Sequence, residues 1–482
     1  MNKQIITFCI VLYLQILVAL AQEPGKTSKP CNFIIILTDD QGWNHTSVLM
    51  DKKNPKSRSD YIQTPNLERF ASESMRFSQG YAPAPVSAPT RYSIQYGKTP
   101  ARLRKTIVFG GSDHVNHDQP TLVQMLKAQN PDYKAAHFGK WHIGVEPEEL
   151  GYDFSDGKTS NSPGGFNEEG NEKWGVNLKE DPKLTFSLSK RSNRFMSKMV
   201  EAGNPFLLQV SYYAAHADLV ALPETYEKYK KLPKGTMHKN AIYAAMVENL
   251  DAGIGMVLNQ VKALGIEDNT YIFLLSDNGG VPKIPPQRGA YPVSTNFPLT
   301  RGKWDLLEGG IRVPFFIAGP GIKGNSQCNR PVIAYDIMPT ILDLAERDKP
   351  LPKEFDGGSL VPVFTGFEPV KRNTPDLIFH YGRVSYNGFG DIHSAIVDKN
   401  GRFKLLKLVN TGKVYLFDLD NDLAEQYDVS NLYPGIAKEL NNKLSRYIDE
   451  HYGQLEVESA TSKPYPYEPT EVLNIKTIGT AQ

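Results

Sequence analysis

The stretch Phe33-Ile34-Ile35-Ile36-Leu37-Thr38-Asp39-Asp40 decides the fold class expected of this chain. Five consecutive apolar residues predict a strand that is covered on both faces, because a half-exposed strand alternates apolar and polar side chains. The run ends in two aspartates, and in open parallel sheets ligands bind beyond the carboxyl ends of the strands. The stretch therefore predicts a central strand of a parallel sheet, with a polar site at its end.

Strands and helices alternate along the chain that follows. Apolar runs at 135–138, 206–213 and 271–275 predict three further strands. Thr64-Pro65 predicts a helix start with a capping hydroxyl, and apolar residues at helical spacing predict a second helix that ends at Gly265. This alternation predicts an α/β fold, in which helices flank a mixed, mostly parallel sheet.

Residues 1–21 have the pattern of a secretory signal peptide. Lys3 gives a positive start, an apolar run follows, and Ala19-Leu20-Ala21 gives the small-residue end at which cleavage is expected. A membrane anchor is the alternative, and the polar residues that follow at once disfavour it. The segment predicts export to the periplasm or cell surface, with no membrane span after cleavage.

The rest of the chain is predicted to divide near residue 370. Residues 22–370 hold the alternating pattern and are expected to form the larger domain, which carries the site. Residues 371–482 are expected to form a C-terminal α+β subdomain, in which a helix at 436–452 packs on a small antiparallel sheet. The strands of that sheet are predicted at 394–397, 403–408 and 414–418.

Composition limits the partners. The 482 residues carry a formal net charge of +1, so bulk electrostatics gives no reason to expect nucleic acid binding. Cleavage would leave Cys31 and Cys328, which cannot make a disulfide scaffold but could pair if they lie close. Residues 151–185, rich in Gly, Asn, Ser and Glu, are expected to form a surface insertion that either helps to bind substrate or has no role.

Four side chains that follow two predicted strands suggest a metal site: Asp39, Asp40, Asp277 and Asn278. Three carboxylates that converge without a cation would repel one another, and a divalent ion removes this repulsion. Because the donors are oxygens, Ca²⁺ or Mg²⁺ is favoured over zinc, with Ca²⁺ preferred. For any single aspartate, a turn or a helix cap is the alternative.

Basic side chains follow the strands as well. Lys140 and His142 come after the strand at 135–138, His216 after the strand at 206–213, and Lys303 later in the chain. If the first strand continues, Lys140 and His142 point into one cleft. Taken alone, His216 would sooner be a structural histidine than a catalytic one.

Ser87-Ala88-Pro89-Thr90-Arg91 begins a predicted helix. The first N–H groups of a helix have no partner within it, and together with Arg91 they favour an anion. Ser87 is therefore expected where an anionic ester group would be held, although the pattern occurs by chance in many loops.

In these motifs the chain resembles the formylglycine-dependent arylsulfatase-type sulfatases of the alkaline phosphatase-like superfamily. The resemblance runs from about residue 31 to 430 and includes Gly139-Lys140-Trp141-His142, Ser276-Asp277-Asn278-Gly279 and Glu308-Gly309-Gly310-Ile311-Arg312. It implies a sulfuric ester hydrolase in which Ser87 is oxidised to formylglycine and is itself a metal ligand. The serine form implies a bacterial source and an anaerobic sulfatase-maturing enzyme as partner.

The resemblance also implies roles for the basic residues. Arg91 and Lys140 would stabilise the hydrated aldehyde, and His142 would be the base for sulfate expulsion. His216 and Lys303 would hold sulfate oxygens and supply a proton to the leaving sugar oxygen.

The implied substrate is a sulfated carbohydrate. Residues 93–102 resemble bacterial sulfatases that act on 6-O-sulfated galactose or N-acetylgalactosamine, in host or algal glycans such as mucin or glycosaminoglycans. One alternative is a phosphatase or phosphotransferase of the same superfamily, which usually carries two metals. The other is an inactive glycan-binding relative.

Overall fold

The computed structural model describes residues 29–108, 115–161, 179–284, 291–345, 352–366, 368–383, 391–453 and 475–479. The predicted signal peptide lies outside these ranges, as do residues 162–178 of the 151–185 stretch.

Within the described ranges, eight strands form the central sheet in the order β5-β4-β6-β1-β7-β8-β2-β9. β1 pairs in parallel with β6 and β7, and β4 pairs in parallel with β5 and β6, whereas β8 is antiparallel to β7 and β2. The mixed, mostly parallel sheet is confirmed. Its strands are β1 (Asn32–Thr38), β2 (Met75–Phe77), β4 (Lys134–Gly139), β5 (Phe154–Ser155), β6 (Phe206–Ser211), β7 (Thr270–Ser276), β8 (Phe315–Ala318) and β9 (Ser326–Cys328).

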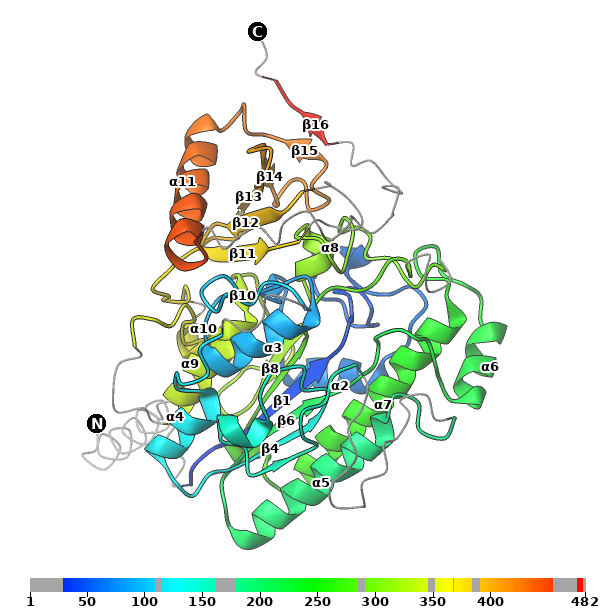
Figure 1. Ribbon diagram of the computed structural model, residues 1–482. Helices are drawn as coiled ribbons and strands as arrows, with labels where there is room; N and C mark the ends of the chain where they lie inside the picture. Colours follow the sequence, from blue (N-terminus) through cyan, green and yellow to red (C-terminus); the bar gives the residue numbers. More distant parts are fainter. Residues whose placement is uncertain are drawn as a thin grey trace, which may run out of the picture.

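Helices cover both faces of this sheet (Figure 1). One layer is α2 (Pro65–Glu73), α5 (Thr185–Ala202), α6 (Pro223–Lys231) and α7 (Ala241–Ala263); the other is α3 (Ser87–Tyr96), α4 (Leu122–Gln129), α9 (Ile337–Leu344) and α10 (Val361–Gly366). The apolar run of β1 serves both layers, because Ile34 and Ile36 pack into one core and Phe33, Ile35 and Leu37 into the other. A strand buried on both faces is what the unbroken apolar run predicts.

The start of α2 differs from the prediction. Thr64 precedes the helix but its side chain caps no N–H group of it. Asp251 of α7 accepts hydrogen bonds from the backbone N–H groups of Asn66 at 2.9 Å and Leu67 at 2.8 Å instead. Burial raises the pKa of Asp251 to about 6, against the lowering effect of these hydrogen bonds. The start of α2 is therefore capped by a residue that is distant in the sequence, and the sequence near the helix does not indicate this cap.

α7 is also unusual in composition. Among the described residues it is the one helix long and apolar enough to cross a membrane, and 78% of its most apolar stretch is buried in the protein. This is the helix that the sequence predicts to end at Gly265, and its burial identifies it as a core helix.

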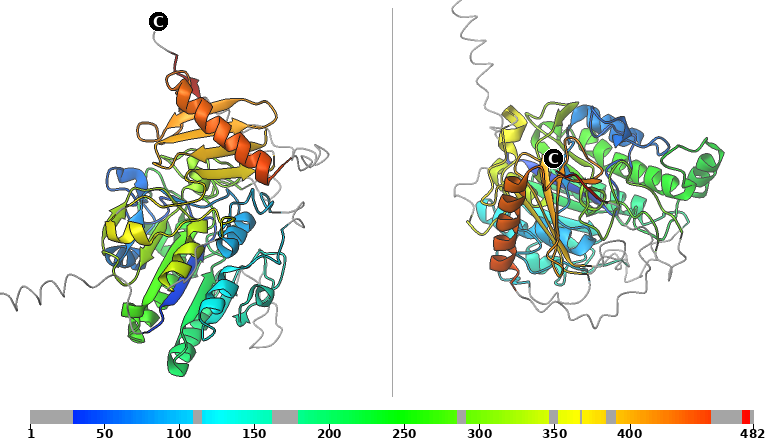
Figure 2. Two further views of the ribbon diagram at one scale, coloured as in Figure 1. Left: turned by 90° about the vertical axis from the view of Figure 1, so that its left-hand side faces the viewer. Right: turned by 90° about the horizontal axis from the view of Figure 1, so that it is seen from above.

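The C-terminal region forms a second, antiparallel sheet of β11 (Leu377–Tyr381), β12 (His393–Val397), β13 (Phe403–Leu408) and β14 (Val414–Asp418). Three of these strands were predicted, and β11 was not. α11 (Pro434–His451) lies across the outer face, as Figure 2 shows, and packs there through Leu440 and Leu444. The inner face packs on Leu306 and Leu307 of the larger domain.

A buried charge cluster crosses this interface. Lys404 of β13 lies 2.9 Å from Glu308 at the start of α8 (Glu308–Ile311) and 2.8 Å from Glu425, and Arg312 lies 2.5 Å from Glu308. Burial alone would raise the pKa of Glu308, but Lys404 and Arg312 hold it at about 2. Burial raises the pKa of Glu425 to about 8, although Lys404 opposes this effect. Two carboxyl groups and two cations are thus paired away from water.

The disulfide that the sequence left open, between Cys31 and Cys328, does not form. Cys31 and Cys328 are both buried, and no disulfide joins them. The core therefore forms without a covalent crosslink between these positions.

The charge cluster predicts a position-specific loss of stability. Lys404→Met should lower the free energy of unfolding by about 3–5 kcal/mol, because it removes the cation that pairs with the buried carboxyl groups of Glu308 and Glu425. Lys407→Met is the matched control: it lies on the same strand, faces α11 and donates to Ser445 at 2.7 Å. It should cost less than about 1 kcal/mol. Denaturant unfolding measures both, and equal losses would contradict the assigned role of the cluster.

Candidate active site

The predicted acidic residues meet at the carboxyl ends of two neighbouring strands. Thr38 of β1 is paired with Ser276 of β7, so the residues that follow each strand lie side by side. The Asp40 N–H donates to Asp277 Oδ1 at 3.1 Å, and Asn278 Nδ2 donates to Asp40 Oδ1 at 2.8 Å. The structure thus brings together the four side chains that the sequence grouped.

Ser87 lies over this group, as the first residue of α3. Its Oγ lies 3.4 Å from Asp39 Oδ1, 3.4 Å from Asn278 Oδ1 and 3.3 Å from Lys140 Nζ. The side chain is 2% exposed. Three elements that are far apart in the sequence converge on this one hydroxyl.

Arg91 lies one turn further along α3. Its guanidinium donates to Asp39 Oδ2 at 3.2 Å, to Asp277 Oδ2 at 2.7 Å and to the backbone carbonyl of Lys140. Asp39 and Asp277 are fully buried, so this pairing offsets a large desolvation cost. Arg91 thereby fixes two acidic residues and the chain at Lys140.

Two lysines complete the charge balance. Lys140 is ion-paired with Asp39, and Lys303 Nζ lies 2.8 Å from both oxygens of Asp40. Burial lowers the pKa of Lys140, Asp39 opposes this effect and Arg91 adds to it. Three carboxylates therefore face three cations in a region with almost no exposed surface.

Both predicted histidines reach the site. His216 Nε2 lies 3.8 Å from Asp40 Oδ2, and its Nδ1 donates to the carbonyl of Ala217 at 2.5 Å. Burial, then Lys303 and Lys140, lower its pKa well below the ordinary value. β4 ends at Gly139, so the strand does not continue through Lys140 and His142, which was the condition for predicting that they point into one cleft. His142 nevertheless has its pKa lowered, by burial first and then by Lys140 and Arg91.

The donor set fits a hard divalent cation. Oxygens of Asp39 and Asn278 approach Ser87 Oγ from two sides, and Asp40 and Asp277 supply further buried carboxylates. One donor atom each from Asp39, Asp40 and His216 lie within 4.8 Å of one another, which adds His216 to the groups that could hold a metal. The sequence did not indicate His216 as a ligand. Predominantly oxygen donors favour Ca²⁺ or Mg²⁺.

Sequence reasoning missed part of the pocket wall. A small pocket is lined by Asp39, Lys140 and His216 together with Asn161, Tyr213 and Lys183. Lys183 is buried, and its charge also lowers the pKa of His216. Asn161 and Lys183 belong to the 151–185 stretch. Because this stretch has no helical or strand periodicity, the sequence did not indicate that they line the site. Its described ends therefore reach the site.

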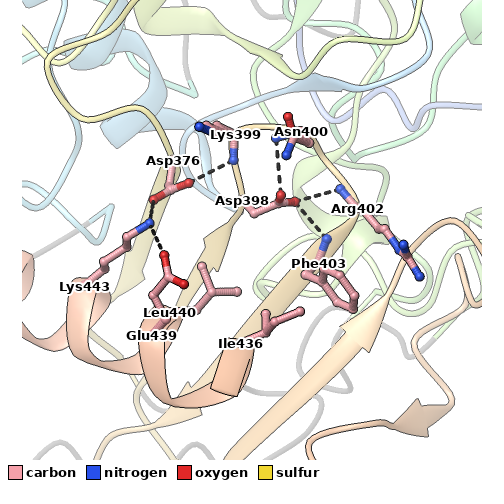
Figure 3. Close-up of a pocket in the computed structure, with 10 residues that line it drawn as sticks. All are labelled: Asp376, Asp398, Lys399, Asn400, Arg402, Phe403, Ile436, Glu439, Leu440 and Lys443. Atoms are coloured by element: carbon pink, nitrogen blue, oxygen red, sulfur yellow. Dashed lines mark hydrogen bonds and ion pairs between the residues drawn. The ribbon is translucent and has the colours of Figure 1, made fainter. Parts of the chain in front are cut away.

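A second hollow lies on the C-terminal sheet, between the β12–β13 turn and α11 (Figure 3). Asp398 accepts hydrogen bonds from backbone N–H groups of its own turn. Lys443 lies 3.0 Å from Asp376 and 2.8 Å from Glu439. These charged groups stabilise the β12–β13 turn and pair with one another beside α11. The hollow therefore does not bring together a set of reactive side chains as the site around Ser87 does. Its lining residues are Asp376, Asp398, Lys399, Asn400, Arg402, Phe403, Ile436, Glu439, Leu440 and Lys443.

One further histidine is buried although its neighbours in sequence are polar. His238 is 3% exposed. Its ring packs edge-on against His45, and its Nε2 lies 3.1 Å from the carbonyl of Thr295. His137, His380 and His393 are also buried, and one ring nitrogen of each makes a hydrogen bond to a neighbouring group.

Comparison with known proteins agrees with this geometry. A family model described as Sulfatase matches residues 31–347, and one described as N-sulphoglucosamine sulphohydrolase, C-terminal, matches residues 302–450. A protein named Sulfatase from Formosa agariphila is 24% identical and covers 94% of each chain. N-acetylgalactosamine-6-sulfatase of Rattus norvegicus is 27% identical over 73% of this chain and 69% of its own.

Solved structures share the fold. The crystal structure of Ps i-CgsB in complex with k-i-k-neocarrahexaose has a TM-score of 0.72 and 24% identity, covering 91% of this chain and 97% of that one. This likeness supports the fold, and the first family model covers well over half of the sequence. The chain belongs to the sulfatase family, the enzymes that hydrolyse sulfate esters.

Proposed function

We propose that this protein is an exported sulfatase that removes 6-O-sulfate groups from galactose or N-acetylgalactosamine in glycans. The observation that carries the proposal is the convergence of Asp39, Asn278 and Lys140 on the Oγ of Ser87 at a helix start. Relatives named for N-acetylgalactosamine-6-sulfate, and a similar fold solved with a neocarrahexaose, support a carbohydrate substrate. The signal-like residues 1–21 support export.

Ser87 would be the reacting position. A formylglycine at this position would supply, as its hydrate, a nucleophilic hydroxyl and a second hydroxyl whose deprotonation releases sulfate. Ca²⁺ held by Asp39, Asp40, Asp277, Asn278 and residue 87 would supply electrostatic stabilisation of the oxygens there. An anaerobic sulfatase-maturing enzyme is the proposed source of the modification.

The other side chains hold charge and move protons. Lys140 would donate to the oxygen on residue 87, which it already approaches at 3.3 Å. Arg91 would act indirectly, by holding Asp39, Asp277 and the Lys140 carbonyl in place through hydrogen bonds from its guanidinium. This changes the role expected from the resemblance, in which Arg91 stabilises the hydrate directly.

His216 and Lys303 both approach Asp40. We assign them the sulfate oxygens and the proton that the leaving sugar oxygen needs, because each places a nitrogen beside this carboxylate. His142 is assigned the base for sulfate release. Its pKa is lowered by burial and nearby cations, which keeps the imidazole unprotonated before the reaction.

The phosphatase alternative fits the charge balance less well. Two metals would need a second set of acidic or histidine ligands, and the places beside Asp39 and Asp40 are taken by Lys140 and Lys303. Basic residues at these positions suit one metal and a monoanionic sulfate ester. The inactive glycan-binding alternative is disfavoured because Ser87, both lysines and both histidines are present.

The role of Ser87 is tested by replacement. Ser87→Ala should lower sulfate release by more than about 10³-fold in matured protein, because no oxygen remains to take the sulfuryl group. Ser93→Ala removes another buried hydroxyl from the same helix and should keep the rate. Sulfate release is measured by ion chromatography, and mass spectrometry confirms oxidation of residue 87. A normal rate in Ser87→Ala would rule out the assignment.

The substrate is tested with a panel of defined sugars. Galactose 6-sulfate and N-acetylgalactosamine 6-sulfate should be cleaved at least about tenfold faster, in kcat/KM, than the glucose-configured and 4-sulfated isomers. A site that hydrogen-bonds the sugar hydroxyls rejects the wrong epimer. Galactose 6-phosphate is included in the panel. Faster phosphate release would favour the phosphatase alternative, and binding without any hydrolysis would favour the inactive relative.

The cation is tested by removal. A chelator should abolish sulfate release and lower Tm, because a bound ion at hundredfold excess over its Kd contributes about 2.7 kcal/mol to stability. Ca²⁺ should restore both properties, Mg²⁺ less well. Asp277→Asn should weaken the rise in Tm on adding Ca²⁺. If chelation changes neither Tm nor rate, the metal assignment is wrong.

A further inference from the structure

The turn that presents Lys140 and His142 has an irregular backbone. β4 ends at Gly139, whose φ is 94°, and His142 has a φ of 57°. The left-handed region is sparsely populated by residues other than glycine, so the surrounding structure must hold it. The four residues 139–142 therefore need support from outside the turn.

Thr159 supplies much of this support. Its Oγ1 donates to the Gly139 carbonyl at 2.6 Å and accepts from the Trp141 N–H at 2.8 Å. Its own carbonyl accepts from the His142 N–H at 2.8 Å. One buried residue thus makes three hydrogen bonds to three of the four residues of the turn.

Asp156, on the same loop, anchors the arrangement to a helix. Its Oδ2 accepts from the Gly139 N–H at 2.8 Å, and its Oδ1 lies 2.7 Å from Arg191 of α5. All of these groups are buried, and β5 just before Asp156 pairs with β4. The loop is therefore fixed to both the sheet and α5.

We propose that Thr159, supported by Asp156, is a positioning residue of the sulfatase reaction. Its hydroxyl fixes the backbone of 139–142 so that Lys140 reaches residue 87 and His142 faces the site. A displacement of about 1 Å at a reacting group costs about 10²-fold in rate, so a hydrogen bond that sets this backbone affects kcat. The inference rests on the roles proposed above for Lys140 and His142. It gives the first part of the 151–185 stretch a function other than contact with substrate.

The experiment compares two substitutions at one position. Thr159→Val keeps the shape of the side chain and removes the hydroxyl, whereas Thr159→Ser keeps the hydroxyl. In matured protein, Thr159→Val should lower kcat about 10–100-fold with KM changed less than about threefold, and Thr159→Ser should stay within about threefold of wild type. A crystal structure of Thr159→Val should show Lys140 Nζ withdrawn from residue 87.

Thr121→Val controls for loss of stability alone. Thr121 is equally buried, and its Oγ1 donates to the Leu150 carbonyl at 2.7 Å and caps α4. It should lower Tm by an amount similar to Thr159→Val and leave kcat unchanged. The inference is overturned if Thr159→Val keeps a normal kcat, if Thr159→Ser is as slow, or if Thr121→Val is as slow.

These outcomes are separate from the proposed function. A normal rate in Thr159→Val beside an active wild type removes this inference and leaves the sulfatase assignment intact. If no ester of the panel is hydrolysed, the crystal structure still decides, because an unchanged approach of Lys140 to residue 87 contradicts positioning and a lengthened one supports it.

Discussion

The pairing of Arg91 with Asp39 and Asp277 is the interaction on which the rest of the site depends. Both carboxylates are fully buried, and together with Asp40 they form an acidic group that would be strongly self-repelling without nearby cations. Arg91 reaches two of the three from one helix, and that same helix presents Ser87 one turn earlier. The same helix, α3, therefore neutralises the buried carboxylates through Arg91 and positions the reacting residue, Ser87.

The C-terminal sheet takes part in this arrangement. The chain that presents Lys303 runs on to Leu306, whose N–H donates to His393 of β12 at 3.1 Å, and then to Glu308, which is ion-paired with Lys404 of β13. Buried contacts with the second sheet thus fix the segment next to Lys303. The antiparallel sheet therefore supports the segment that carries Lys303. The hollow between this sheet and α11 has no such role, because its charged side chains pair with one another.

Sequence reasoning reached the strands and the clusters at their ends because both are local patterns. An apolar run such as 33–37 identifies a buried strand, and parallel strands in register bring Asp39-Asp40 beside Asp277-Asn278. The elements that were missed depend on distant partners. Asp251 caps a helix 185 residues away, Thr159 supports a turn in which the non-glycine residue His142 has a positive φ, and His238 is buried although its sequence neighbours are polar.

The cap that α7 gives to α2 has a consequence before folding is complete. α7 is long and apolar enough to cross a bilayer, and an ionised aspartate near the centre of such a helix costs about 2.5–3.5 kcal/mol there. Asp251 lies close to the midpoint of that helix. The carboxylate that orders the folded core therefore also discourages a nascent chain from lodging in lipid.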